Sequence, residues 1–92
     1  MLFLLHTSGI ISVQKKFPDA SIEIIQADVC NKDDLTKAVK KAVERFGTID
    51  YLINNAGPFI FERKKLIDHT EEEWNQMIRG NLDAVFHLLQ LT

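Results

Sequence analysis

The sequence is poor in several features that would each define a class of protein. It has a single cysteine, Cys30, which excludes an internal disulfide and a cysteine metal site and favours a reducing, cytoplasmic setting. Its net charge is −2, whereas nucleic-acid binding requires a basic face. No apolar run approaches the roughly 18 residues that a membrane-spanning helix needs. We therefore expect neither a nucleic-acid partner nor a membrane partner.

The amino terminus also lacks the marks of a signal peptide. The apolar run at residues 2–5 has no basic residue before it and no clean small-residue cleavage site after it. We interpret this run as a buried strand. His6, His69 and His87 do not have metal-ligand spacing, so no metal site is expected.

What remains is the composition of an ordinary globular domain. Hydrophobic residues make up 46% of the chain and charged residues 26%, which is typical of a soluble protein. Ninety-two residues allow one domain at most, spanning residues 1–92. A chain of this length buries only about 60–65% of its unfolded surface, so its stability is expected to be marginal.

The apolar pattern alternates between strand-like and helix-like segments. The expected strands are residues 2–5, 22–28 and 50–53, and the expected helices are 10–17, 32–46 and one that begins after residue 70. Strands that alternate with helices predict an α/β fold with a parallel sheet and helices on its faces.

The clearest helix is predicted between Asn31 and Gly47. Asn31 is a favourable N-cap, and Gly47 supplies a left-handed stop. Apolar residues between them recur at helical spacing on one face. They are Leu35, Ala38, Val39, Ala42, Val43 and Phe46.

The last helix is predicted to open with the capping box Thr70-x-x-Glu73. Its inner face is predicted to carry Trp74, Met77, Ile78, Leu82, Val85 and Leu89. Asn81 falls on this stripe and is therefore expected to face the core, where an amide needs a specific hydrogen-bond partner. It either anchors a neighbouring loop or points into an active site. Gly80 indicates a kink or close packing beside it.

Two polar stretches follow the predicted strands. Asn54-Asn55-Ala56-Gly57 comes directly after the strand at 50–53, and Asp28 ends the strand at 22–28. Ligands of open parallel sheets bind beyond the carboxyl ends of the strands, so this stretch is interpreted as the lip of a binding crevice. Asp28 either accepts a hydrogen bond from a ligand's amino group or is an ordinary turn residue.

Taken together, these residues resemble the short-chain dehydrogenase/reductase family. The resemblance extends from about Ser21 to Thr92 and is carried by Ala27-Asp28-Val29, Asn54-Asn55-Ala56-Gly57, Glu73-Trp74 and Asn81-Leu82. Within the family, the sequence is most similar in style to bacterial 3-oxoacyl-carrier-protein reductases. The resemblance implies a partial Rossmann-like, doubly wound parallel sheet.

The resemblance also implies roles for particular residues. Asp28 would bind the adenine amino group of a nicotinamide cofactor, and the backbone amide of Val29 would contact the adenine ring. Asn54, Ala56 and Gly57 would line the crevice near the ribose and nicotinamide. Asn81 would match the family's catalytic asparagine, which holds a water in a proton relay.

The cofactor is expected to be NADP or NAD, with NADP favoured. Family members that prefer NAD often have an acidic residue after the second strand, and this chain has His6-Thr7-Ser8 there. A carboxylate at that point would repel a 2′-phosphate, and these side chains would not.

The chain departs from the family pattern in two places. Its glycines stand only at positions 9, 47, 57 and 80, so there is no glycine-rich cofactor turn. Tyr51 is the only tyrosine, and Asn55 stands where the catalytic lysine would follow it. The chain therefore looks like a middle section without the family's first strand and catalytic second half. The absent strand would leave a gap about 4.8 Å wide in the sheet.

The leading hypothesis is a segment of an NAD(P)-dependent oxidoreductase that acts on a small carbonyl or alcohol substrate. These 92 residues alone are expected to be inactive, and a homo-oligomer is an open possibility. The alternative is a non-catalytic remnant or a module that a partner completes. A third interpretation is another α/β binding domain in which Asn54-Asn55 is a coincidence.

Overall fold

The computed structural model describes residues 7–58 and 62–92. The strand expected at 2–5, and His6, lie outside the described residues. The helical elements are α1 (Thr7–Lys16), α2 (Lys32–Phe46), the 3₁₀ turn η1 (Leu66–Asp68), α3 (Glu71–Ile78), the π-helical turn η2 (Arg79–Asp83) and α4 (Ala84–Leu91).

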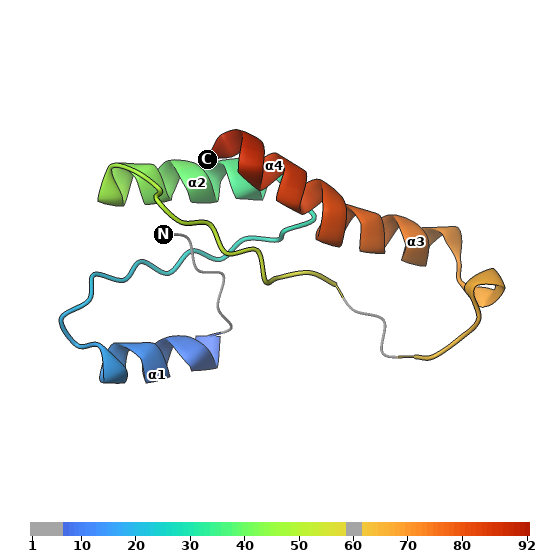
Figure 1. Ribbon diagram of the computed structural model, residues 1–92, viewed down its shortest axis with the longest axis horizontal. Helices are drawn as coiled ribbons and strands as arrows, with labels where there is room; N and C mark the ends of the chain where they lie inside the picture. Colours follow the sequence, from blue (N-terminus) through green and yellow to red (C-terminus); the bar gives the residue numbers. More distant parts are fainter. Residues whose placement is uncertain (1–6, 59–61) are drawn as a thin grey trace.

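The helices lie on two sides of a pair of extended segments (Figure 1). α2 and α4 lie next to each other on one side, and α1 lies on the other. The extended segments, residues 21–28 and 48–58, run between them. The radius of gyration is 15.4 Å. A compact domain of this length would have about 12 Å, so the chain is open rather than closely packed.

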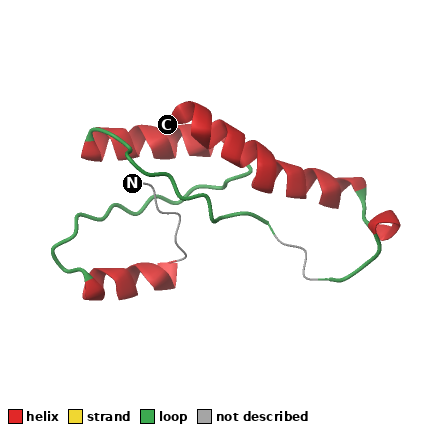
Figure 2. Ribbon diagram, in the orientation of Figure 1, coloured by secondary structure: helices red, strands yellow, loops and turns green. Residues whose placement is uncertain are grey.

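The predicted parallel sheet is not confirmed by the described residues. Figure 2 shows residues 21–28 and 48–58 as loops, and within the described ranges the only ladder contact is an isolated bridge at Leu52. Exposure nevertheless alternates from Ile24 to Val29, as it does in a strand. The two segments are not strands because a strand needs a hydrogen-bonded neighbour about 4.8 Å away, and these segments do not pair with each other.

The prediction for α2 is confirmed at both ends. The side chain of Asn31 accepts hydrogen bonds from the amides of Asp33 and Asp34 at 3.0 and 3.2 Å. Gly47 has a φ of 83°, a conformation that glycine adopts without steric cost. The buried stripe is narrower than predicted, because Val43 and Phe46 are exposed and only the other four members are buried.

The core forms where α2 meets α4. Its buried members are Leu35, Val39 and Ala42 of α2 with Ala84 and Leu88 of α4. Apolar residues of the extended segments, and of the turn that follows the first of them, pack against this cluster: Ile25, Val29, Ile49 and Leu52. The extended segments are thereby held beneath the two helices.

The first helix begins earlier than predicted. α1 starts at Thr7 rather than near Ile10 and ends at Lys16. Apolar spacing alone defined the predicted start, and Thr7-Ser8-Gly9 carries no apolar signal.

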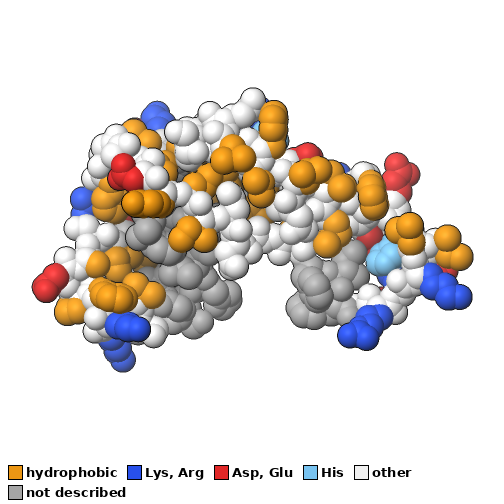
Figure 3. Space-filling model, viewed as in Figure 1, with side chains coloured by type: hydrophobic (Ala, Val, Ile, Leu, Met, Phe, Trp, Pro, Cys, Tyr) orange, Lys and Arg blue, Asp and Glu red, His pale blue; other side chains and the backbone are white. Residues whose placement is uncertain are grey.

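The last helix is continuous from Glu71 to Leu91, with η2 as a wide turn in its middle. Its predicted inner face is correct only in part, because Met77, Ile78 and Val85 are half-buried. Trp74, Leu82 and Leu89 are exposed, and apolar side chains reach the surface along this helix in Figure 3. The buried residues are Gly80, Ala84 and Leu88, at a spacing of four. Small residues let the helix approach its neighbours closely, so packing selects this face over the one with the largest side chains.

The lengths of the described helices bear on membrane insertion. No helix in residues 7–58 and 62–92 is long and apolar enough to cross a bilayer.

Candidate crevice at the wide turn of the last helix

Three segments that are distant in the sequence meet at η2. The side-chain amide of Asn81 donates hydrogen bonds to the carbonyl oxygens of Pro58 and Met77, each at 3.1 Å. The bond to Pro58 joins the helix to the end of the Asn54–Gly57 stretch, 23 residues earlier in the chain. π turns of this kind are frequent at functional sites.

Two glycines make this approach possible. A Cβ atom on Gly57 would overlap the side-chain oxygen of Asn81. A Cβ atom on Gly80 would overlap the ring of Pro58 and lie 3.1 Å from the sulfur of Cys30. Of the two alternatives predicted at Gly80, close packing is therefore confirmed, and the residue lies in the π turn. Larger residues at these two positions would push the three segments apart.

Asp28 lies at the turn that brings the third segment to this place. Its carboxylate Oδ1 accepts a hydrogen bond from the amide of Cys30 at 2.9 Å. Its own amide donates to Oδ2 of Asp34 at 3.0 Å. These bonds are those of an ordinary turn residue. The Asp28 side chain remains exposed at the edge of the three-segment junction.

The prediction that Asn81 faces the core is wrong. The residue is exposed, although both of its amide hydrogens are bonded. Of its two interpretations, the geometry displays the loop anchor, with Pro58 as the anchored residue. The sequence pattern failed here because it assumed that the helix buries its large apolar side chains.

The other candidate residues border the same junction. Asn54, Ala56 and Gly57 are exposed, and Val29 is half-buried against the core. An exposed carboxylate at Asp28 and exposed amides at Asn54 match the chemistry of an adenine amino group and of ribose hydroxyls. This donor and acceptor set fits a dinucleotide.

Cys30 packs into the junction as a thiol. Burial raises the pKa of its thiol, and the carboxylate of Asp28 raises it further. A raised pKa keeps the sulfur protonated near neutral pH, which makes it a poor nucleophile. Cys30 therefore serves packing against Gly80 rather than covalent chemistry.

The sequence did not point to several residues that the structure brings into play. Pro58 and Met77 act through backbone carbonyls, which carry no sequence signal. Lys64 and Glu73 form an ion pair of 2.7 Å that no sequence pattern predicted. The spacing of His69 and Glu73, at i and i+4, was the one available signal for that cluster.

Comparison with known proteins identifies the family to which the chain belongs. The sequence profile of the short chain dehydrogenase family matches residues 6–92. The chain therefore belongs to the short chain dehydrogenase family.

Two curated relatives illustrate the similarity. One is a Bacillus subtilis (strain 168) protein named as an oxidoreductase, YtkK, which is 55% identical over 69 residues. The other is the 3-oxoacyl-[acyl-carrier-protein] reductase FabG of Staphylococcus epidermidis, 39% identical over 66 residues. The matches cover 75% and 72% of this chain but 27% and 26% of the relatives, so the chain spans about a quarter of their length.

Solved structures support the α/β fold of the family. A Bacillus thuringiensis protein described as a 3-oxoacyl-reductase is 52% identical, with a TM-score of 0.83 over 96% of this chain and 38% of that chain. A Serratia marcescens short-chain dehydrogenase/reductase mutant has a TM-score of 0.79 over 97% of this chain and 36% of that chain. At 24% identity, the second likeness concerns the fold alone.

Proposed function

We propose that this chain forms one wall of the cofactor crevice of an NAD(P)-dependent oxidoreductase that acts on a carbonyl or alcohol carbon of a small molecule. The observation that carries the proposal is the contact of Asn81 with Gly57 and Pro58. It joins two of the four sequence motifs that carry the family resemblance. The turn at Asp28, the extended segment at 48–58 and the last helix thereby border one place, as a dinucleotide site requires.

The adenine half of the cofactor is assigned to the turn at Asp28. Its exposed carboxylate accepts a hydrogen bond from the amino group, and the backbone amide of Val29 donates to the ring. The bonds of Asp28 to Cys30 and Asp34 support this role, because they fix the direction of the carboxylate.

The ribose and nicotinamide half is assigned to Asn54, Ala56 and Gly57. When bound, the nicotinamide supplies or accepts a hydride. Asn81 is assigned the role of holding the water of a proton relay. Its two amide hydrogens are already bonded, which holds the side chain in one orientation.

NADP is the proposed form of the cofactor. α1 begins at Thr7, and its first turn carries no acidic residue that would repel a 2′-phosphate. Tighter binding of NADPH than of NADH, by about tenfold, is expected because no carboxylate at this point repels the 2′-phosphate. Equal affinity for the two would contradict this choice.

Hydride transfer by these 92 residues alone is not expected. Tyr51 is the only tyrosine, and Asn55 stands four residues after it in place of a lysine. The pure chain should therefore not oxidise NADPH in the presence of a 3-oxoacyl thioester. Detectable turnover would overturn this statement.

A chimaera tests the proposal directly. Residues 21–92 would replace the matching segment of the Bacillus thuringiensis relative, which is 52% identical. We expect the folded chimaera to reduce acetoacetyl thioester with NADPH at a rate within about tenfold of its parent. A folded chimaera that binds neither NADPH nor NADH would contradict the proposal.

A module completed by a partner is the second candidate. The observation that favours it is the open face of the extended segments, where Ile24, Tyr51 and Ile53 are exposed opposite the core. Apolar side chains on such a face favour association. Concentration-dependent assembly of the chain, with no cofactor binding, would support this candidate over the first.

A further inference from the structure

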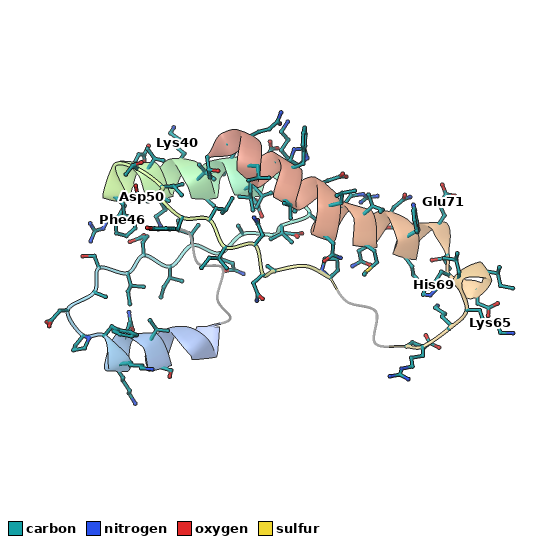
Figure 4. All side chains as sticks on the ribbon, viewed as in Figure 1. Lys40, Phe46, Asp50, Lys65, His69 and Glu71 are labelled. Atoms are coloured by element: carbon teal, nitrogen blue, oxygen red, sulfur yellow. The ribbon has the colours of Figure 1, made fainter. Side chains whose placement is uncertain are left out.

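A cluster of three charged or titratable side chains lies outside the crevice, at the beginning of α3. The carboxylate of Glu73 binds Nζ of Lys64 through Oε1 at 2.7 Å and Nδ1 of His69 through Oε2 at 2.9 Å. The three side chains are between 21% and 26% exposed, far less than typical surface charges. Figure 4 places His69 at the corner between η1 and α3.

The pKa values of Lys64 and Glu73 favour the charged forms of these two side chains. The bond from Lys64, followed by that from His69, lowers the pKa of Glu73. The hydrogen bond between Lys64 and Glu73 also raises the pKa of Lys64. The carboxylate and the ammonium therefore remain charged over a wider pH range than they would alone, and the contact persists through neutral pH.

The helix does not need this carboxylate for its own start. In a complete capping box, the glutamate returns to the backbone amide of the N-cap residue. Here Thr70 Oγ1 accepts from the amide of Glu73 at 3.1 Å, while the Glu73 side chain turns to Lys64 and His69 instead. The carboxylate is thus directed to the chain segment that precedes the helix.

The same helix holds the other end of that segment. Asn81 lies eight residues after Glu73, about 12 Å along a helix, and binds Pro58. The connection that leaves the crevice at Pro58 therefore returns to the helix at Glu73 through Lys64. Both ends contact the same continuous helix, and in the sequence only residues 59–63 separate the two attachments.

We propose that Lys64, His69 and Glu73 form a clasp that positions Gly57 and Pro58 against Asn81, which makes Glu73 a positioning residue for the crevice. Without the clasp, the first contact that ties the chain to α3 after Pro58 would move from Lys64 to Thr70, so the number of residues between the two attachments would grow from five to eleven. The entropy of loop closure grows with this number, so the Pro58 end would be held less firmly. The importance of the clasp for cofactor binding rests on the proposed function. The coupling between the clasp and Asn81 is a property of the chain and does not depend on that function.

Hydrogen exchange in the full 92-residue chain, without any cofactor, tests the coupling. The probe is the side-chain amide of Asn81, observed by NMR. We expect Glu73→Gln to accelerate its exchange with water by about threefold, the factor that the longer loop implies, together with the backbone amides of residues 62–70. Lys64→Gln should do the same, and Lys64→Arg, which keeps the cation, should stay within about twofold of the parent.

Glu72→Gln is the matched control, because it removes the same charge from the same helical turn at an exposed side chain. It should leave Asn81 unchanged. Acceleration confined to residues 62–70 would show that the three side chains stabilise only the start of the helix, and it would overturn the clasp as a positioning device. No acceleration anywhere would overturn it as well. Because no cofactor is present, neither result depends on whether the chain belongs to a working oxidoreductase crevice.

Discussion

The two halves of the last helix are held in different ways. α4 packs against α2 through the buried Ala84 and Leu88, whereas α3 has no buried residue at all. The α3 half is located by polar contacts instead, at Thr70 and Glu73. The wide turn η2, with Asn81, lies at the boundary between the two.

The comparison teaches how a site can be placed at the edge of a core. Apolar burial is strong but non-directional, so it fixes α4 without fixing fine geometry. Hydrogen bonds and ion pairs add little net stability but specify distances and angles. The candidate crevice lies where the first kind of support gives way to the second. The predictions that follow separate these two kinds of support.

The largest effect is expected from the apolar half. Leu35 is fully buried, at 0% exposed, beneath the α4 contact. Leu35→Ala should lower the free energy of unfolding by about 2–5 kcal/mol, because it removes apolar burial and leaves a cavity. Urea denaturation measures this loss. Leu82→Ala, at a residue 62% exposed, is the control and should change stability by less than about 0.5 kcal/mol. Equal losses of stability in the two variants would contradict the claim that apolar burial holds the α4 half.

The next effect is expected at the boundary. Gly80→Ala should destabilise the chain by about 1–3 kcal/mol through overlap with the Pro58 ring. This cost outweighs the roughly 1 kcal/mol by which alanine favours a helix over glycine. The substitution should be less costly in a Pro58→Ala background, where the ring is absent. A stabilising Gly80→Ala would mean that the three segments do not meet as described.

The two helix caps sharpen the comparison further. Asn31→Ala should cost about 1 kcal/mol of global stability, because α2 carries most of the core. Thr70→Ala removes a similar bond but from α3, which buries nothing. It should accelerate exchange of the first α3 amides while leaving the urea midpoint nearly unchanged. A midpoint that falls equally in both variants would count against the division into two kinds of support.

The smallest effect is expected on the exchange of Asn81 when the pH is lowered. Because the pKa of Glu73 is lowered in the folded chain, its contribution is complete above the ordinary value of 4.5 and is lost as the pH falls through the lowered pKa. The ratio of Asn81 exchange in Glu73→Gln to that in the parent should therefore exceed one at neutral pH and approach one in stronger acid. Taking the ratio removes the pH effects that the two proteins share. A ratio independent of pH would contradict the role of the carboxylate.

Local signals in the sequence predicted the parts of the fold that local chemistry determines. Asn31 and Gly47 bound α2 as expected, and Thr70 begins α3. The strands were not confirmed among the described residues, because pairing is a non-local property. The buried face of the last helix was correct only in part because Gly80 and Ala84 were selected by close packing, which a hydrophobic pattern does not weigh.

The candidate site was predictable only in part. The motifs at Asn54–Gly57 and Asn81 were evident, and the structure brings Gly57 and Asn81 together. Their roles toward a cofactor stay a prediction. The anchor at Pro58 and the clasp at Glu73 depend on contacts between segments distant in the sequence, for which a single sequence offers no direct signal.

The most direct test of the account is the kinetics of Asn81→Ala in the chimaera that carries residues 21–92. If Asn81 orients the crevice and holds the relay water, kcat should fall by about a hundredfold while the dissociation constant for NADPH stays within about twofold. Equal loss of turnover and cofactor affinity would show that Asn81 only supports the fold. Unchanged kcat would contradict the proposed crevice altogether.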